Sequence, residues 1–205
     1  MNALYPAAGT GWLDETEKAR AHLYRLLAIT LARPPDEAVL TVLAGLDGDA
    51  GEIGTALRAV AGIAGSLTVA MARREYDALF VGMTRGEVVP YASFYLTGFL
   101  YERPLARIRT DMADLGVALV EGRSDPEDHI ATILDVMASL IDGSAIPAQT
   151  VARQREFFRR HIEPWAGRCF ADLEQAASAQ LYRPLATAGR LLVELEREAF
   201  LMESP

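Results

Sequence analysis

Three residues with chemically useful side chains gather in one short polar stretch of the sequence: Asp125, Asp128 and His129. Two carboxylates and an imidazole could accept hydrogen bonds from a cationic ligand or carry out acid–base chemistry. The same stretch also has the pattern of a helix start. Asp125 suits the N-cap, Pro126 suits the first helical position, and Asp128 suits the acid of a capping box. Local chemistry leaves both interpretations open.

The helix that must position these residues follows directly. Its apolar residues recur at the spacing of one helical face: Ile130, Ile133, Leu134, Met137, Leu140 and Ile141. This periodicity predicts an amphipathic helix with its apolar face in a core. Asp125, Asp128 and His129 are therefore expected at the N-terminal end of a buried helix.

An aromatic segment lies upstream of that helix. Tyr91, Phe94, Tyr95, Phe99 and Tyr101 fall within eleven residues. They fit either a buried core segment or an apolar groove with phenol hydroxyls, which would suit a bound peptide. The neighbouring Ser93 lacks the GxSxG setting and a paired His/Asp spacing, so a nucleophilic serine is not expected.

Composition limits the classes of partner. The chain has 205 residues and a formal net charge of −8, which fits one domain over residues 1–205 and argues against nucleic acid. A cationic partner is compatible with that charge. The only cysteine, Cys169, excludes an internal disulfide, and no zinc or iron–sulfur pattern is present, so no metal or cofactor is expected.

No stretch of the sequence has the features of an export signal or a membrane span. Residues 1–18 lack the charged start and apolar run of a signal peptide. The longest uncharged runs are shorter than the ~20 residues needed to cross a bilayer. We therefore expect a cytoplasmic protein without stable membrane insertion.

The rest of the chain reads as helices separated by short breaks, with no convincing β alternation and no phosphate-binding loop. We predict an all-α domain of about nine to ten helices. Residues 1–12 are expected to form a flexible arm, and residues 117–126 a connection that could act as a hinge. The main predicted helices cover residues 14–32, 36–43, 52–64, 66–80, 104–116, 126–141, 148–161, 165–177 and 181–201.

Several motifs in order carry a family resemblance: Glu75-Tyr76 with Leu79-Phe80 and Gly82; Pro90-Tyr91-Ala92-Ser93 with Tyr95-Leu96; Pro126 to Ile130; Gln154, Phe157-Phe158, His161, Pro164-Trp165 and Phe170; and Leu181 to Ala186. Together they resemble the TorD/DmsD family of redox-enzyme maturation chaperones, to which the NarJ proteins are related. One departure is Asp125, since the family commonly has Glu before this proline.

The resemblance implies a TorD-like, all-helical, cytoplasmic chaperone that is not an enzyme. Family members bind an apo molybdoenzyme of the dimethyl-sulfoxide-reductase class, often through its twin-arginine signal peptide, until the molybdopterin cofactor is inserted. The implied binding groove consists of Leu79, Phe80, Pro90, Tyr91 and Ser93 beside Asp125, Pro126, Asp128 and His129. In this groove the carboxylates would accept guanidinium hydrogen bonds and the apolar surface would hold the apolar run of the signal.

Two other functions stay open at this stage. The first is an enzyme that binds or hydrolyses nucleotide with Asp128 and His129, since weak guanine-nucleotide binding is associated with the family. The absence of a phosphate loop, a metal cluster and an evident nucleophile argues against it. The second is self-assembly, in which helices exchanged across the connection at 117–126 would give a domain-swapped homodimer.

Overall fold

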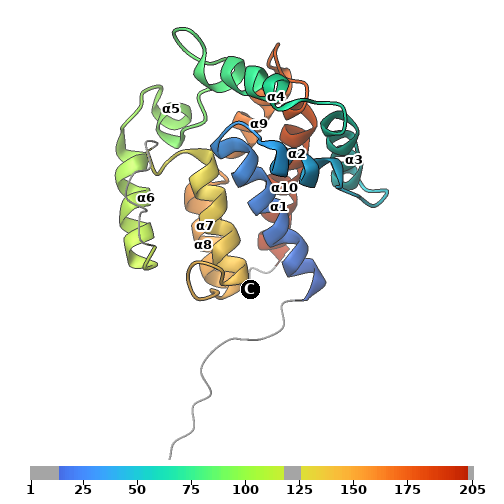
Figure 1. Ribbon diagram of the computed structural model, residues 1–205. Helices are drawn as coiled ribbons and strands as arrows, with labels where there is room; N and C mark the ends of the chain where they lie inside the picture. Colours follow the sequence, from blue (N-terminus) through green and yellow to red (C-terminus); the bar gives the residue numbers. More distant parts are fainter. Residues whose placement is uncertain (1–13, 118–125, 203–205) are drawn as a thin grey trace, which may run out of the picture.

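The computed structural model describes residues 14–117 and 126–202, and its regular structure is helical (Figure 1). That part of the chain contains ten α-helices, one π-helix and no strand, so the predicted all-α fold is confirmed. The elements are α1 (Glu15–Ala32), α2 (Glu37–Ala44), α3 (Glu52–Ala64), α4 (Val69–Tyr76), η1 (Asp77–Val81), α5 (Ala92–Thr97), α6 (Arg103–Asp114), α7 (Ile130–Asp142), α8 (Val151–His161), α9 (Ala166–Gln175) and α10 (Tyr182–Met202). The predicted arm at 1–12 and most of the predicted hinge at 117–126 lie outside the described residues.

Several helices begin where the sequence predicts, because their caps are local. The Asp14 carboxylate accepts a hydrogen bond of 2.8 Å from Glu17 N, and Asp36 does the same for Val39 N at 2.9 Å. Side chains that satisfy the first free N–H groups of a helix fix its starting residue. The starts of α1 and α2 therefore follow from neighbouring residues alone.

Helix α7 is the centre of the molecule. It packs along α1, and Figure 1 shows the two helices side by side. Arg25 of α1 joins them by binding Asp135 at 2.7 Å and Asp142 at 2.9 Å. Apart from Asp135 and Asp142, all residues of α7 are buried, including the polar Ser139. The helix is therefore enclosed on nearly all sides rather than amphipathic.

The predicted start of α7 is wrong by about one turn. The helix begins at Ile130 with His129 as its N-cap, and Pro126 is not its first residue. Pro126 instead begins a turn in which its carbonyl accepts His129 N at 3.0 Å, and Asp128 belongs to that turn. Asp125 lies outside the described residues.

The predicted helix at 66–80 is divided into two parts. Thr68 caps α4, and the chain then widens into the π-helix η1, which ends at Gly82. Gly82 N binds Asp77 O at 2.6 Å, and the φ of Gly82 is +62°. A side chain at Gly82 would meet the Arg85 carbonyl, so the turn after η1 requires glycine.

The remaining helices surround this centre. Helix α10 packs on α3 and α9, while α5 and α6 lie to one side of the α1–α7 pair in Figure 1. Inside the bundle, Arg20 of α1 binds Glu196 of α10 through two hydrogen bonds of 2.6 and 2.8 Å. A single hydrophobic cluster contains buried residues from α1 to α10.

Candidate functional site

The two motifs of the predicted groove meet at a seam between the start of α5 and the start of α7. Three hydrogen bonds hold it: Ile130 N to Pro90 O at 2.8 Å, Ala92 N to Asp128 O at 2.9 Å, and Ser93 N to the Asp128 carboxylate at 2.9 Å. Two segments far apart in sequence are thus fixed next to each other, mainly by backbone contacts.

Tyr91 and His129 lie opposite each other across the seam. They form an isolated antiparallel bridge, and their rings meet edge to face with centroids 4.9 Å apart. The Nδ1 atom of His129 accepts a hydrogen bond of 3.2 Å from Ala131 N. This ring nitrogen must be unprotonated to accept, so His129 serves as a helix cap in this arrangement.

Asp128 also has a structural function. Its side chain is 1% exposed, and one carboxylate oxygen caps the first turn of α5 through Ser93 N. Ser93 is fully buried, and its hydroxyl accepts a hydrogen bond of 3.3 Å from Glu102 N. A ligand could reach Asp128 or Ser93 only if the seam opened.

The other predicted groove residues differ in exposure. Pro90 and Leu79 are buried, whereas Phe80, Tyr91 and Pro126 are half-buried. Phe80 packs on Tyr76 and Tyr182, with ring centroids 4.9 and 5.3 Å apart. The part of the predicted groove that a partner can touch is therefore small, and the nine-residue site stays a prediction.

Exposed apolar residues next to the seam belong to the aromatic segment, which the sequence left open between a buried core segment and a peptide-binding groove. The exposed fractions are 71% for Phe99 and 73% for Tyr101, and Leu96 and Leu100 are exposed at 40% and 41%. The aromatic spacing drew attention to this segment, but periodicity cannot tell an exposed loop from a buried one. We call residues 96–101, which are the last two residues of α5 and the four that follow it, the aromatic loop.

The aromatic loop is held in place by polar contacts. The Thr97 hydroxyl donates to Ser93 O at 2.8 Å and lies 3.3 Å from Phe99 N, which can donate to it. Tyr101 has a φ of +63°, and it is the only non-glycine residue with positive φ in the described ranges 14–117 and 126–202. A strained residue that persists must be stabilised by its surroundings, and such residues cluster at functional sites.

Beneath this loop, α5 packs on α9. The Tyr95 hydroxyl donates to Asp172 at 2.8 Å, and its ring lies 5.5 Å from that of Trp165. Burial raises the pKa of Tyr95, and contact with Cys169 and Asp172 raises it further. Burial also raises the pKa of the Cys169 thiol to about 12, so this cysteine is a core residue and not a nucleophile.

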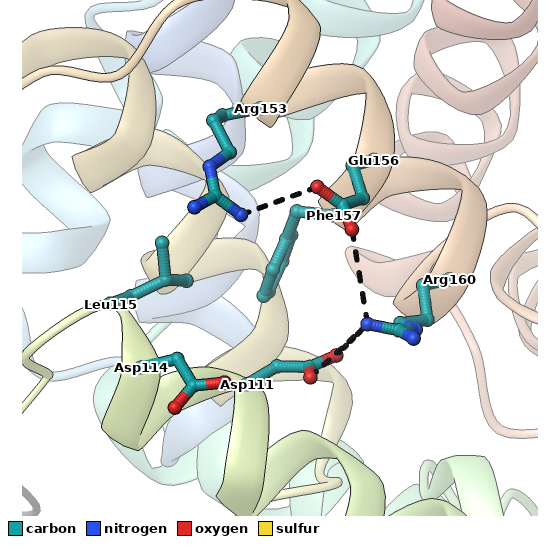
Figure 2. Close-up of a pocket in the computed structure, with 7 residues that line it drawn as sticks. All are labelled: Asp111, Asp114, Leu115, Arg153, Glu156, Phe157 and Arg160. Carbon is teal, nitrogen blue, oxygen red and sulfur yellow. Dashed lines mark hydrogen bonds and ion pairs between the residues drawn. The ribbon is translucent and has the colours of Figure 1, made fainter.

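A separate small pocket lies between α6 and α8 (Figure 2). Its volume is about 130 Å³, and Leu115 and Phe157 form its apolar part. A chain of charges borders it: Arg153 binds Glu156 at 3.4 Å, and Arg160 lies 4.0 Å from Glu156. Arg153 and Arg160 are both exposed, so these ion pairs lie at the surface of α8.

Asp111 of α6 completes that chain, and sequence reasoning missed it. Its carboxylate lies 3.1 Å from Arg160 and 2.6 Å from His161 Nε2. Burial lowers the pKa of His161; contact with Asp111 raises it, and the charges of Arg160 and Arg107 lower it. These contacts attach α6 to α8.

Residues 14–117 and 126–202 lack two further kinds of feature. Within these ranges no cluster of three or more His, Cys, Asp or Glu side chains could hold a metal ion. None of the described helices has the length and apolar character of a bilayer span.

Known proteins resemble the chain over different lengths. The family model described as nitrate reductase delta subunit matches residues 44–171. The chaperone protein TorD of Vibrio cholerae serotype O1 is 32% identical over 94 residues, which cover 42% of this chain and 43% of the relative. The chain thus aligns with less than half the length of this relative. TorD of Shewanella loihica is 25% identical over 91% of this chain and 96% of the relative.

The fold also matches a solved structure. A crystal structure from Archaeoglobus fulgidus, assigned as a redox enzyme maturation protein, superposes with a TM-score of 0.59 at 20% identity. The match covers 95% of this chain and 99% of that chain, and it supports the same helical fold. Since the family model covers more than half of the sequence and agrees with the ordered motifs, the chain belongs to the nitrate reductase delta subunit family, the group of TorD- and NarJ-related proteins.

Proposed function

We propose that the chain is a cytoplasmic maturation chaperone for a redox enzyme and not itself an enzyme. Its client would be an apo molybdoenzyme of the dimethyl-sulfoxide-reductase class, bound through a twin-arginine signal peptide. The chaperone would hold this client while the molybdopterin cofactor is inserted, before export. Family membership and the chaperone names of the relatives support the proposal.

The single observation that carries the binding mode is the exposed aromatic loop. Phe99 and Tyr101 expose most of their surface, yet backbone N–H groups of Phe99 and Glu102 are bound by hydroxyl groups of α5. Exposed apolar patches mark interaction sites, and aromatic side chains that are already ordered bind at low entropic cost. This loop is suited to the apolar run of a signal peptide.

The seam supports this surface from below. Asp128 and Ser93 fix the start of α5, and α5 leads directly into the aromatic loop. In this proposal Asp128 and His129 position the peptide-binding surface, while Tyr91, Phe80 and Pro126 contribute their exposed parts. The net charge of −8 attracts the cationic end of a twin-arginine signal at long range.

The first experiment identifies the client. The tagged chain is captured from its own cells grown without oxygen, and the proteins bound to it are identified by mass spectrometry. We expect one cofactor-free molybdoenzyme, and we expect its capture to fail when its signal peptide is removed. Capture that survives removal of the signal would overturn signal-peptide binding, and the lack of any molybdoenzyme would overturn the chaperone function.

The second experiment tests the surface. Phe99→Ser combined with Tyr101→Ser should lower the affinity for a synthetic peptide of the captured client's signal by about tenfold or more, since aromatic anchors dominate such interfaces. Helicity should stay unchanged, because both side chains are exposed. Val42→Ser is the matched control, since Val42 on α2 is 61% exposed. Equal affinity in the double variant and the control would contradict the assignment.

A further inference from the structure

A cleft of about 300 Å³ opens between α4 and the turn that precedes α10, away from the seam residues. Its apolar walls come from Leu67, Met71 and Ala78, and Met71 is 47% exposed. Glu75 also lines this cleft. It belongs to the Glu75-Tyr76 motif, to which the predicted groove gives no function.

Glu75 uses only one of its carboxylate oxygens inside the protein. Its Oε1 atom accepts two hydrogen bonds, from Gln180 N at 2.7 Å and from Tyr182 N at 2.9 Å, and thereby caps α10. Its Oε2 atom has no hydrogen-bond partner in residues 14–117 and 126–202. The side chain as a whole is only 8% exposed.

The lack of a partner for Glu75 Oε2 indicates that this oxygen is in contact with solvent. Within the described part of the chain, every fully buried side-chain nitrogen or oxygen has a hydrogen-bond partner. An oxygen without a partner must therefore reach solvent, and Glu75 reaches it at the cleft that it lines. A carboxylate oxygen that lines a cleft with apolar walls can accept a charge-assisted hydrogen bond from a cation bound there.

The residues around the cleft indicate whether a free ion or a cationic side chain of a polypeptide would bind there. Ser178 lines it, and the hydroxyl and backbone N–H of Ser178 both donate to Glu87. A second carboxylate, that of Glu87, is thus bound to one of the residues that line the cleft. Arg74 lines the cleft as well, and its guanidinium can donate to backbone carbonyl groups of a bound chain. These features fit a cation carried on a polypeptide better than a free ion.

The backbone beside Glu75 is unusual. The π-helix η1 begins two residues after it and carries Ala78 into the cleft wall. Short π-helical segments are rare and frequently occur at functional sites. The wider turn ends at Gly82, whose positive φ is needed to return the chain.

We propose that this cleft receives one arginine or lysine side chain of the client polypeptide, with its charged end at Glu75 Oε2. The aliphatic part of that side chain would lie on Leu67, Met71 and Ala78. The inference rests on the proposed function and adds a specific acceptor for the cationic part of the signal peptide. The aromatic loop would bind the apolar part.

The test is a double-mutant cycle with full-length chain and a labelled twin-arginine signal peptide. Glu75→Gln keeps an oxygen that can accept from Gln180 N and Tyr182 N but removes the negative charge. We expect it to weaken binding about tenfold, the usual size for the loss of one charge-assisted hydrogen bond. Replacing both peptide arginines by glutamine should weaken binding to the wild-type chain by at least as much. The loss should be clearly smaller with Glu75→Gln.

Two further variants keep the result interpretable. Glu198→Gln removes one exposed carboxylate of α10 and controls for net charge, so it should bind like wild type. Ala78→Leu fills the cleft without altering Glu75 and should also weaken binding. If the wild-type chain binds the peptide and Glu75→Gln and Ala78→Leu bind equally well, the cleft assignment alone is overturned. If the wild-type chain does not bind, the proposed signal-peptide function fails as well.

Discussion

The Asp128 carboxylate accepts a hydrogen bond of 2.9 Å from Ser93 N, although the two residues are 35 positions apart. The Asp128 carbonyl accepts from Ala92 N at the same distance. Asp128 therefore supplies the cap that α5 lacks in its own sequence, since Tyr91, at its N-cap position, makes no side-chain cap. The start of α5 and the aromatic loop after it depend on a residue next to α7.

Asp128→Ala should lower the free energy of unfolding by about 1–2 kcal/mol, because it removes a helix cap and leaves a buried N–H group without a partner. Asp128→Asn should lose less, since its amide oxygen can still accept from Ser93 N. Urea unfolding of the three proteins measures the difference.

The same two variants show whether Asp128 only positions α5 or also contacts the signal peptide directly. If Asp128 only positions α5, Asp128→Asn should bind the signal peptide almost as well as wild type. A large loss of affinity in a stably folded Asp128→Asn protein would instead indicate that the charge itself meets the peptide. Both results are obtained from one titration of each protein.

Removal of Glu196 should have a larger effect on stability. Its side chain is 2% exposed and binds Arg20 through two hydrogen bonds, with Tyr24 at 3.2 Å. Glu196→Ala removes the buried partner of Arg20 and leaves it only the pair with Glu17 at 2.5 Å, which should cost about 3 kcal/mol. The comparison is Glu163→Ala, which breaks the more exposed Arg197–Glu163 pair and should cost less than about 1 kcal/mol. Similar losses in both variants would show that burial of Glu196 has little effect.

Sequence reasoning worked where the determinants of structure are local. The helices predicted at 14–32, 36–43 and 52–64 lie within a few residues of α1, α2 and α3, and local caps at Asp14 and Asp36 explain the first two starts. The resemblance placed the Pro90 and Asp128 segments in one groove; the structure brings the segments together, and the groove stays a prediction. Short-range patterns and ordered motifs are sufficient for such features.

It failed where a residue binds a distant partner. Asp128 looked like the capping acid of its own helix, whereas its carboxylate caps α5. Glu75 binds the start of α10 more than 100 positions away, and no local pattern indicates this. The exposure of Phe99 could not be predicted either, because aromatic residues of similar spacing are usually buried.

Stability should fall when the pH is lowered through the range in which His161 titrates. Burial lowers the pKa of His161 in the folded protein below its usual value, so the unfolded chain binds this proton more readily. Below about pH 6.5 the unfolded state gains a proton that the folded state does not, which favours unfolding by up to about 1.4 kcal/mol per pH unit. The loss should end when the pH passes below the lowered pKa.

His161→Gln removes this titration and is the variant to compare. Urea midpoints between pH 7.5 and 5.5 should fall less steeply for His161→Gln than for wild type. Asp111 opposes burial by stabilising the protonated ring, while Arg160 and Arg107 act in the same direction as burial. If wild type instead gained stability relative to the variant at low pH, Asp111 would be the dominant influence.

Cys169 should be unreactive in the folded protein. Its side chain is 2% exposed, and burial raises its pKa to about 12, so almost no thiolate is present at pH 8. Labelling by a thiol reagent should be slow in buffer and fast in a denaturing concentration of urea. Rapid labelling without denaturant would mean that α9 opens locally.

A substitution at Tyr101 should affect the stability of the protein and its affinity for the signal peptide in different directions. Its φ of +63° is unfavourable for a tyrosine, whereas asparagine tolerates the left-handed region well. Since the Tyr101 side chain is 73% exposed, its removal costs little packing. Tyr101→Asn should therefore be as stable as wild type or more stable by up to about 1 kcal/mol, as relief of such strain predicts.

The same variant should bind the signal peptide several-fold more weakly, because an exposed aromatic anchor has been lost. Urea unfolding and peptide titration on one preparation give both numbers. The control is Phe99→Leu, which keeps an apolar side chain on the aromatic loop without changing the strained position. A Tyr101→Asn protein that is destabilised would show that the tyrosine is there for packing. A protein that gains stability while losing affinity would show that the strained backbone is retained because the partner needs this side chain.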